Sequence, residues 1–554
     1  MKEILSKLVT EALSELFGIG EVSFTVEHPK DMSHGDYATN AALVVAKQLD
    51  KNPVEIAEQL VTYLNEHKGD TIGAISIAGP GFINFTLVRD VFVKGLQDAQ
   101  SKKWGSTDVY ADKKILVEHS SPNLFKPFHI GHLMNNTIGE SITRLAKSSG
   151  AQVSTMSFPS DISLGVAKAI YILLEKYGAD FVPTDVAVLG DAYVEGTKRY
   201  EDDPLVQVRV KEIADNLYAG KSSPEFTLFN ACKKINIEYF EQIVAGLGSH
   251  FDSYIYESEA GIDGKKIVLA NIPNVFEHGE GGAIIYAPGN RLHTAVFINS
   301  QGNPTYEAKD IGLLDLKFTR HNPDLSIFIT DAQQVSHFQV VLDAAAKIQK
   351  EWADKSLHRY HGRMSFKGQK MSSRLGGVPL VEDVLAAVID EVKEKNPDIS
   401  TDIAEVIGIA AIKFAILRTA AGKDINFDPD TSLSFEGDSG PYLQYTAVRA
   451  GSLLEKAVGI TPDTSHPVVG TETLERLIAR LPEVVATAQA EWAPHHLVGY
   501  LLELAQAFNS WYGQGKIIDD NTAATAYRLA IVAATRQTLT NGLWMLGIEV
   551  PEKM

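Results

Sequence analysis

The chain has 554 residues, of which 45% are hydrophobic and 22% are charged, and its formal net charge at pH 7 is −19. This length and apolar content are enough for two or three domains, each with its own core. The negative charge excludes strong nonspecific binding to RNA, although a basic track on one face could still bind it, and the single cysteine, Cys232, excludes an internal disulfide and a multi-cysteine zinc site.

Residues 1–108 are predicted to form a small α+β domain. Its first helix is amphipathic and carries acidic residues, unlike a signal peptide, and is predicted to end at Gly18. No apolar run in the chain approaches the length of a membrane span, so we expect no membrane partner and a cytoplasmic location. The other elements predicted here are a strand at 22–26, a helix at 53–67, and strands at 72–77 and 82–87.

Residues 109–428 alternate short β-rich runs with helical stretches. This pattern predicts a parallel sheet with helices on both faces. The polar, helical stretch at 178–250 is predicted to be an insertion, and 382–395 to be an amphipathic helix. The candidate strands are 115–117, 152–156, 283–286, 295–298 and 325–330.

From residue 429 to residue 554 the strand signals vanish, and long helical patterns predict an α-helical bundle. The predicted helices are 474–490, 496–511 and 523–546. Several aromatic residues could stack on unpaired bases, but we expect most of them to pack in the core. These residues are Tyr442, Tyr445, Phe508, Trp511 and Tyr512.

The most informative segment, residues 115–133, has the sequence ILVEHSSPNLFKPFHIGHL. Its first three residues predict a buried strand, its two prolines break the backbone, and a helix is predicted to begin at Phe128. The first turn carries His129, Gly131 and His132. Unpaired backbone N–H groups, a glycine against which a flat ring can lie, and two imidazoles that can donate to phosphate oxygens favour a nucleoside triphosphate. Metal ligation, or a surface role for both histidines, is the alternative at this point.

A second segment, Lys370-Met-Ser-Ser-Arg374, is basic and is followed by Leu-Gly-Gly. This composition predicts a mobile loop in which Lys370, followed by Met371 and Ser372, brings positive charge onto a departing pyrophosphate. The alternative is a solvated surface loop without a ligand.

In this order and at this spacing, the two segments resemble the two signatures of class I aminoacyl-tRNA synthetases. Other stretches narrow the resemblance, over nearly the whole chain, to the arginyl-tRNA synthetase family. They are residues 34–40 (HGDYATN), 120–123 (SSPN), 305–306 (TY) with Asp310, Gln334 with His337, 440–445 (GPYLQY), 508–509 (FN) and the ending from Leu543 to Met554.

The resemblance implies a multidomain α/β protein. Its parts would be an N-terminal α+β domain that contacts the tRNA elbow, a Rossmann-like catalytic domain of class I, and an α-helical C-terminal domain that reads the anticodon. The implied reaction is the ATP-dependent ligation of L-arginine to tRNA(Arg) through an arginyl-adenylate, with release of AMP and pyrophosphate.

An arginine pocket needs carboxylates and neutral acceptors around the planar guanidinium, which is always charged. Glu118 lies at the end of the predicted strand and Asp310 lies one helical turn after Tyr306. By resemblance, both hold arginine, together with Asn123, Tyr306 and Gln334. The alternatives are a structural ion pair for Glu118 and a solvated helix charge for Asp310.

Catalysis of adenylate formation requires alignment of two anions and stabilisation of charge on the phosphates. His129, His132 and Lys370 are predicted to do this. Ser373 stands where many loops of class I synthetases have a second lysine, so Lys126 is the candidate for the missing charge. The sequence also departs from the family pattern at Met134, at Asp331 and at residues 160–165, which leaves the contacts to the α-amino and carboxylate groups open.

The remaining expectations concern partners. Candidate tRNA contacts are Asn84, Phe85, Tyr442, Tyr445, Phe508, Trp511 and Met554. Mg²⁺ is expected to enter with ATP, no residue is predicted to ligate a metal, and a monomer is expected. Two other functions stay open: a catalytically silent paralogue that binds tRNA or senses arginine, and a class I synthetase for another amino acid.

Overall fold

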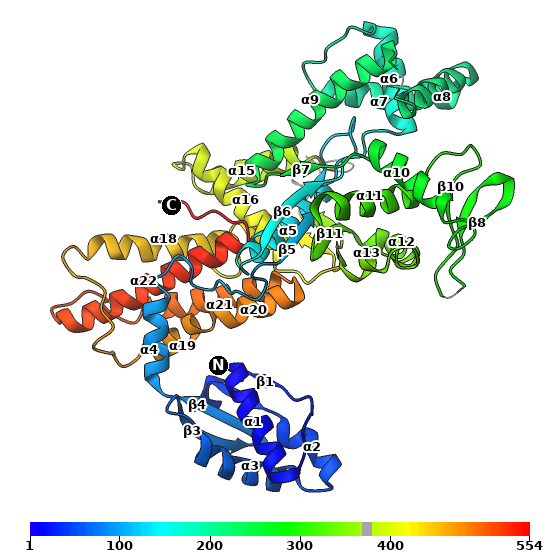
Figure 1. Ribbon diagram of the computed structural model, residues 1–554. Coiled ribbons are helices and arrows are strands. Elements are labelled where there is room, and N and C mark those ends of the chain that lie inside the picture. Colours follow the sequence, from blue (N-terminus) through cyan, green and yellow to red (C-terminus); the bar gives the residue numbers. More distant parts are fainter. Residues whose placement is uncertain (221, 290, 368–378) are drawn as a thin grey trace. The chain divides into compact units, whose positions relative to one another are not determined.

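The computed structural model describes residues 1–220, 222–289, 291–367 and 379–554 (Figure 1). The chain divides into two compact units. The smaller unit consists of Met1–Trp104, Ala450–Leu481 and Ala507–Thr538, and the larger of Gly105–Arg449, Pro482–Gln506 and Leu539–Met554. Within the described ranges, no helix combines the length and the apolar content that a membrane crossing requires.

In the smaller unit, three helices pack on an antiparallel sheet with the strand order β1-β2-β4-β3. The predicted helix at 53–67 and the predicted strand at 82–87 are confirmed. The first helix ends at Gly18, whose φ of 66° is the left-handed conformation that glycine adopts without strain. The elements are α1 (Lys2–Phe17), β1 (Val26–Glu27), η1 (Met32–His34), β2 (Tyr37–Thr39), α2 (Ala41–Leu49), α3 (Pro53–His67), β3 (Ile72–Ala78) and β4 (Phe82–Leu87).

The predicted strand at 22–26 is wrong, because only Val26 and Glu27 pair with a neighbouring strand. The backbone N–H of Thr25 donates to the side chain of Asn40 instead of to a strand, at 2.8 Å. Val22 and Phe24 still pack on the core. The alternation of apolar residues therefore arises from packing without a hydrogen-bonded ladder.

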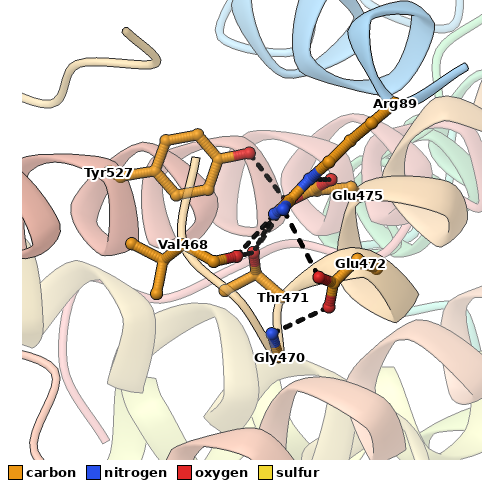
Figure 2. A network of polar contacts seen from close by, with 7 residues as sticks. All are labelled: Arg89, Val468, Gly470, Thr471, Glu472, Glu475 and Tyr527. Atoms are coloured by element: carbon orange, nitrogen blue, oxygen red, sulfur yellow. Dashed lines mark hydrogen bonds and ion pairs between the residues drawn. The ribbon is translucent and has the colours of Figure 1, made fainter. Parts of the chain in front are cut away.

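A buried polar network joins α4 (Arg89–Asp98) to α19 (Glu472–Ala479) in the smaller unit (Figure 2). The fully buried carboxylate of Glu475 accepts from Arg89 at 2.6 and 3.0 Å, from Thr471 at 2.6 Å and from Tyr527 at 2.7 Å. Burial raises the pKa of Glu475, but these hydrogen bonds outweigh burial and lower it. The carboxylate is therefore ionised and fully paired.

The larger unit contains a five-stranded sheet that is parallel throughout, with the order β12-β11-β5-β6-β7. Three of its strands correspond to predicted strands, at 115–117, 152–156 and 325–330. The strands are β5 (Lys114–Glu118), β6 (Gln152–Ser157), β7 (Ser253–Tyr254), β11 (Leu325–Asp331) and β12 (Ser356–His361).

Helices cover both faces of this sheet, as predicted. On one face, α5 (Ile130–Lys147) buries Ile142 and Ala146 against Ile115 and Val117. On the other face, α10 (Glu257–Ala270) and α11 (Tyr306–His321) pack against Leu116 and its neighbours. Alternate residues of β5 therefore point into two different cores.

Two predicted strands do not join the parallel sheet. They are β9 (Ile284–Tyr286) and β10 (Ala295–Ile298), which form a separate antiparallel sheet with β8 (Glu277–His278). The connection between β9 and β10 is too short for the crossover that parallel neighbours need. Conversely, the edge strand β12 has the polar sequence SLHRYH, which gave no strand signal.

The polar stretch at 178–250 is helical, as predicted, and lies in the chain between β6 and β7. Its helices are α7 (Ala187–Asp202), α8 (Pro204–Tyr218) and α9 (Pro224–Gly246), which share a core with α6 (Leu164–Tyr177). Cys232 is buried in that core, and burial raises the pKa of its thiol to about 12. The thiol is therefore inert at neutral pH and packs as a small apolar residue.

The predicted helix at 474–490 is two helices, α19 and α20 (Leu481–Glu491). The break lies at Arg480, two residues before Pro482, because a proline has no N–H to donate to the carbonyl four residues earlier. The other elements are η2 (Glu280–Gly282), η3 (Ala332–Gln334), α12 (Val335–Ile348), α13 (Lys350–Asp354), β13 (Met364–Phe366), α15 (Val381–Lys395), α16 (Thr401–Leu417), β14 (Ile425–Phe427), α17 (Pro429–Ser432), α18 (Gly440–Lys456), α21 (His495–Tyr512) and α22 (Thr522–Met545).

Candidate active site

The two histidines of the HIGH sequence cap the N-terminus of α5 reciprocally. The backbone N–H of Gly131 donates to Nδ1 of His129 at 3.2 Å, and the backbone N–H of His129 donates to Nδ1 of His132 at 3.1 Å. Their rings stack with centroids 3.9 Å apart. Because each Nδ1 accepts a hydrogen bond, each neutral ring carries its proton on Nε2. Both rings therefore retain one N–H donor.

Burial keeps both rings uncharged at neutral pH. Burial, with the nearby His129, His361 and Lys126, lowers the pKa of His132 to about 3. Burial and Lys126 also lower the pKa of His129. The two histidines therefore offer donors and the helix dipole to a phosphate, and Lys126 is the charged group beside them.

Lys126 lies at the rim of a cavity of about 260 Å³ next to His129. Its ammonium lies 5.0 Å from the ring centre of Tyr193, a residue of α7. The cavity is lined by Phe125, Lys126, Pro127, His129, Gly190, Tyr193, Val194 and Leu380.

The predicted lysine loop, with Lys370, Met371, Ser372 and Ser373, lies outside the described residues. The segment that follows it pairs with the histidine segment. The N–H of Ile130 donates to Pro379 O at 3.0 Å, and the N–H of Val381 donates to Phe128 O at 2.9 Å. Residues 379–381 are therefore held beside the start of α5.

Glu118 and Asp310, predicted to hold arginine, line one small pocket together with Lys317. The rest of the lining is apolar and includes Phe328. Glu118 forms a buried ion pair with Lys317, so the structural ion pair considered for it is present. Lys317 also lies 5.1 Å from the ring centre of Phe328. Lys317 was missed in the sequence, although it stands two helical turns after Asp310.

Asp310 is 9% exposed, which excludes a solvated helix charge. Its carboxylate lies 2.6 Å from Nε2 of His337, and Glu307 lies 3.6 Å from the other ring nitrogen. Burial lowers the pKa of His337, but hydrogen bonds to Asp310 and Glu307 outweigh burial and raise the pKa to about 10. The imidazole is therefore protonated at neutral pH.

These groups form a cluster with one unmatched negative charge. The carboxylates of Glu118, Asp310 and Glu307 face two cations, Lys317 and His337; Glu307 and His337 are partly exposed and lie outside the pocket lining. An excess of one negative charge in this partly buried cluster disfavours an anionic ligand and favours a side chain with one positive charge.

Glu257 is a further buried carboxylate that the sequence analysis missed. It pairs with Lys309 at 2.7 Å. Burial and the nearby Asp310 raise the pKa of Glu257, although Lys309 lowers it. Its sequence context at the start of a helix carries no signal that separates it from a surface residue.

Asn123, Tyr306 and Gln334 are exposed, and Tyr306 is 64% exposed at the start of α11. Asn123 lies in the loop after β5, which bridges to Ser160. Gln334 follows the end of β11. These three predicted arginine ligands therefore stand at the carboxyl ends of strands or at a helix start, and only Glu118 and Asp310 line the pocket itself.

The positions at which the sequence departs from the family pattern, Met134, Asp331 and residues 160–165, have structural roles. Met134 is buried in the core of the larger unit. Asp331 caps η3 by accepting from the N–H of Gln333 at 2.7 Å. Within 160–165, the fully buried Asp161 accepts from Lys233 and from the hydroxyl of Ser258, both at 2.7 Å. Asp161 therefore links the helical stretch at 178–250 to α10.

Two predicted tRNA contacts are wrong in this conformation, because Phe85 and Phe508 are fully buried and cannot stack on a base. Asn84 and Tyr442 are also buried, while Trp511 is half-buried. Tyr445 is half-buried under the guanidinium of Arg449, 4.5 Å from its ring centre, and Met554 packs on the core that contains Phe128. Of the five aromatic residues that were mostly expected to pack in the core, Phe508 and Tyr442 are buried, Tyr445 and Trp511 are half-buried, and Tyr512 is exposed, so the expectation holds for only two of them.

Over the ranges that the structure describes, no group of three or more His, Cys, Asp or Glu side chains could hold a metal ion. The described part of the site combines N–H donors at the start of α5 with a small pocket lined by Glu118, Asp310 and Lys317.

Three family models match the chain. Residues 3–87 match the arginyl tRNA synthetase N terminal domain, 96–428 the catalytic domain of tRNA synthetases class I (R), and 443–554 the DALR anticodon binding domain. The chain is 30% identical over 566 residues to an arginine–tRNA ligase of Alkaliphilus metalliredigens, covering 99% of each. It is 28% identical over 568 residues to that of Clostridioides difficile, covering 100% of this chain and 99% of the relative.

Solved structures agree. The arginyl-tRNA synthetase of Thermus thermophilus is similar over 100% of both chains, with a TM-score of 0.82 and 26% identity. That of Plasmodium falciparum has a TM-score of 0.83 over 100% of this chain and 99% of its own, at 20% identity, and so supports the fold alone.

Proposed function

The chain belongs to the arginyl-tRNA synthetase family of class I, and on that premise we propose how its residues carry out the reaction. The reaction is the ATP-dependent ligation of L-arginine to tRNA(Arg). One observation best supports our assignment of residues. Glu118, Asp310 and Glu307 face Lys317 and His337 and leave one unmatched negative charge. Glu118 and Asp310 line a small pocket, and Glu118 is the last residue of β5, the strand whose following loop leads to the histidines.

In the first step, a carboxylate oxygen of arginine attacks the α-phosphorus of ATP. The bond to pyrophosphate breaks and arginyl-adenylate forms. His129 and His132 would donate from Nε2 to phosphate oxygens, and Lys126 would add a positive charge beside them. Lys370 would add a second positive charge to the developing charge on the phosphates.

In the second step, a ribose hydroxyl of the terminal adenosine of tRNA attacks the arginyl carbonyl, and AMP leaves. The protein's part in both steps is to position the reactants and to stabilise charge on phosphate.

Selection of arginine would occur at Asp310 and Glu118. A guanidinium entering the pocket balances its unmatched charge, and Asp310 can accept from it while keeping His337 as its second partner. Asn123, Tyr306 and Gln334 would contact the α-amino and carboxylate groups, which suits their exposure around the pocket.

Mg²⁺ would enter bound to the phosphates of ATP, because the ion is commonly held by phosphate oxygens and water in such sites. We further propose that the protein acts as a monomer in the cytoplasm, and that the exposed parts of the N-terminal domain and of residues 443–554 contact tRNA(Arg).

The test is ATP–pyrophosphate exchange with each of the twenty amino acids, with and without tRNA(Arg). We expect exchange with arginine alone, and only when tRNA is present. Exchange with a different amino acid would indicate another class I specificity, and no exchange under any condition would indicate a silent paralogue.

A further inference from the structure

The second half of α5 carries polar groups that the proposed mechanism does not use. Arg144 donates to Trp544 O at 3.1 Å and to Gly248 O at 3.0 Å, and its side chain pairs with Glu140 at 2.6 Å. The hydroxyl of Ser141 donates to Met545 O at 3.0 Å. The last carbonyls of a helix lack partners within it. Ser141 and Arg144 therefore cap the C-terminal end of α22.

A buried lysine completes this cap. Lys413 of α16 is 3% exposed and donates to Gly547 O at 2.5 Å and to Leu247 O at 2.7 Å. Burial lowers its pKa to about 8, as does the nearby Arg144. Gly547 lies two residues after the end of α22 with φ +69°, and a Cβ there would be in ordinary contact with Glu140 at 3.4 Å and with Lys413 at 3.5 Å. Ser141, Arg144 and Lys413 together form the seat of the end of α22.

A second helix is attached to the same half of α5. The amide of Gln489 in α20 donates to Leu145 O at 3.1 Å and to the hydroxyl of Ser148 at 3.0 Å. Its carbonyl accepts from the hydroxyl of Thr107 at 2.7 Å. All of this network lies in the larger unit. Two helices of the region 443–554 are therefore fixed to the end of α5 that lies away from the histidines.

Hydrogen bonds of this kind specify direction and register, which apolar packing alone does not. Burying a lysine is unfavourable unless its donors are satisfied, and an apolar side chain would fill the same space without that penalty. A helix of 18 residues is about 27 Å long and stiff along its axis. A shift at the seat of α22 would therefore move the first turn of α5, where His129 and His132 lie.

We propose that α5 transmits the bound state of the helical region 443–554 to the phosphate-binding histidines, with Ser141, Arg144 and Lys413 as positioning residues. The inference rests on the proposed function, because it concerns how tRNA bound at that region affects adenylate formation. It adds a physical route that consists of named hydrogen bonds.

The experiment compares two substrates: intact tRNA(Arg) and a minihelix that keeps the acceptor stem but lacks the anticodon arm. The variants are Ser141→Ala, Arg144→Met and Lys413→Met. Lys147→Met is the matched control, because it removes a positive charge from the exposed face of α5. Values of kcat and KM are measured for each substrate, and thermal unfolding shows which variants are folded.

We expect the wild-type protein to charge intact tRNA with a higher kcat than the minihelix. Coupling between two sites commonly changes a binding affinity by roughly 5- to 150-fold, and we expect a kcat advantage of about that order here. In Arg144→Met and Lys413→Met this advantage should fall toward one, through a loss of kcat on intact tRNA with its KM near wild type. The control should keep the full advantage, and Arg144→Lys should restore part of it.

If the variants lose kcat equally on both substrates, the inference is overturned, and Ser141, Arg144 and Lys413 only stabilise the packing of the helices. A wild-type protein that charges both substrates equally would also overturn it, while the proposed function would stand. A wild-type protein that charges neither substrate would contradict the proposed function itself. If Lys413→Met does not fold, Ser141→Ala removes a single hydroxyl and gives the same comparison.

Discussion

The substitution Asp310→Asn tests the arginine pocket most sharply. It replaces a buried carboxylate, 9% exposed and 2.6 Å from His337, with an amide of the same shape. The carboxylate proposed to accept directly from the guanidinium is then lost. A guanidinium cannot lose its proton, so it would enter a site that no longer balances its charge.

The size of the effect follows from burial. Removing one partner of a desolvated charge pair weakens binding by about 2 to 5 kcal/mol. At 1.36 kcal/mol for each factor of ten, this corresponds to a loss in kcat/KM for arginine of roughly 30- to 5,000-fold. The loss of its closest carboxylate also lets the raised pKa of His337 fall toward its ordinary value.

The assay is steady-state charging of tRNA(Arg) at varied arginine, ATP and tRNA. Only the arginine parameters should change, because Asp310 is not assigned to the other two substrates. Asp315→Asn is the control, since it removes a carboxylate from the same helix outside the pocket. Citrulline, which has the shape of arginine without its charge, should be rejected less strongly by the Asp310 variant than by wild type. Normal arginine kinetics combined with full rejection of citrulline would refute the proposed pocket.

Three further predictions concern the helix α5 and the buried network of Figure 2. Glu475→Gln should lower the free energy of unfolding, measured by denaturant titration, by about 2 to 3 kcal/mol. This is less than for a fully buried ion pair, because the partner Arg89 is partly exposed. The control Glu472→Gln removes a half-exposed carboxylate and should change the free energy of unfolding by less than about 1 kcal/mol. Gly139→Ala places a Cβ 2.2 Å from the ring of His119 and should lower stability by about 1 to 3 kcal/mol, so an unchanged melting temperature would contradict the packing of α5. Because the pKa of His132 is about 3, kcat/KM for ATP should show no inflection near pH 6.5, and an inflection there that disappears in His132→Asn would show that this ring is charged during turnover.

Local sequence patterns predicted most helices and strands, because the formation of these elements depends largely on residues that are close in the chain. The strand at 115–117 and the helix after Phe128 were visible from apolar runs and prolines. The first turn of α5 could also be predicted to bind phosphate, from its glycine and its two histidines. The reciprocal cap of His129 and His132 could not, because either histidine could have faced solvent at the same spacing.

The sequence did not predict which strands and which charged side chains, far apart in the chain, pair with one another. The strands at 284–286 and 295–298 had the composition of strands, but nothing in them specified an antiparallel partner over the parallel sheet. In the pocket, Glu118 and Asp310 were predicted as a pair of charges for a ligand. Their internal partners, Lys317 and His337, come from α11 and α12, and only the fold brings these cations to the carboxylates.

The most direct measurement of the central claim is the charging of purified tRNA(Arg) by the wild-type protein with ATP and all twenty amino acids together. The aminoacyl group on the terminal adenosine would be identified by mass spectrometry. We predict arginine alone. Another amino acid on the tRNA, or an uncharged tRNA after complete incubation, would contradict the account.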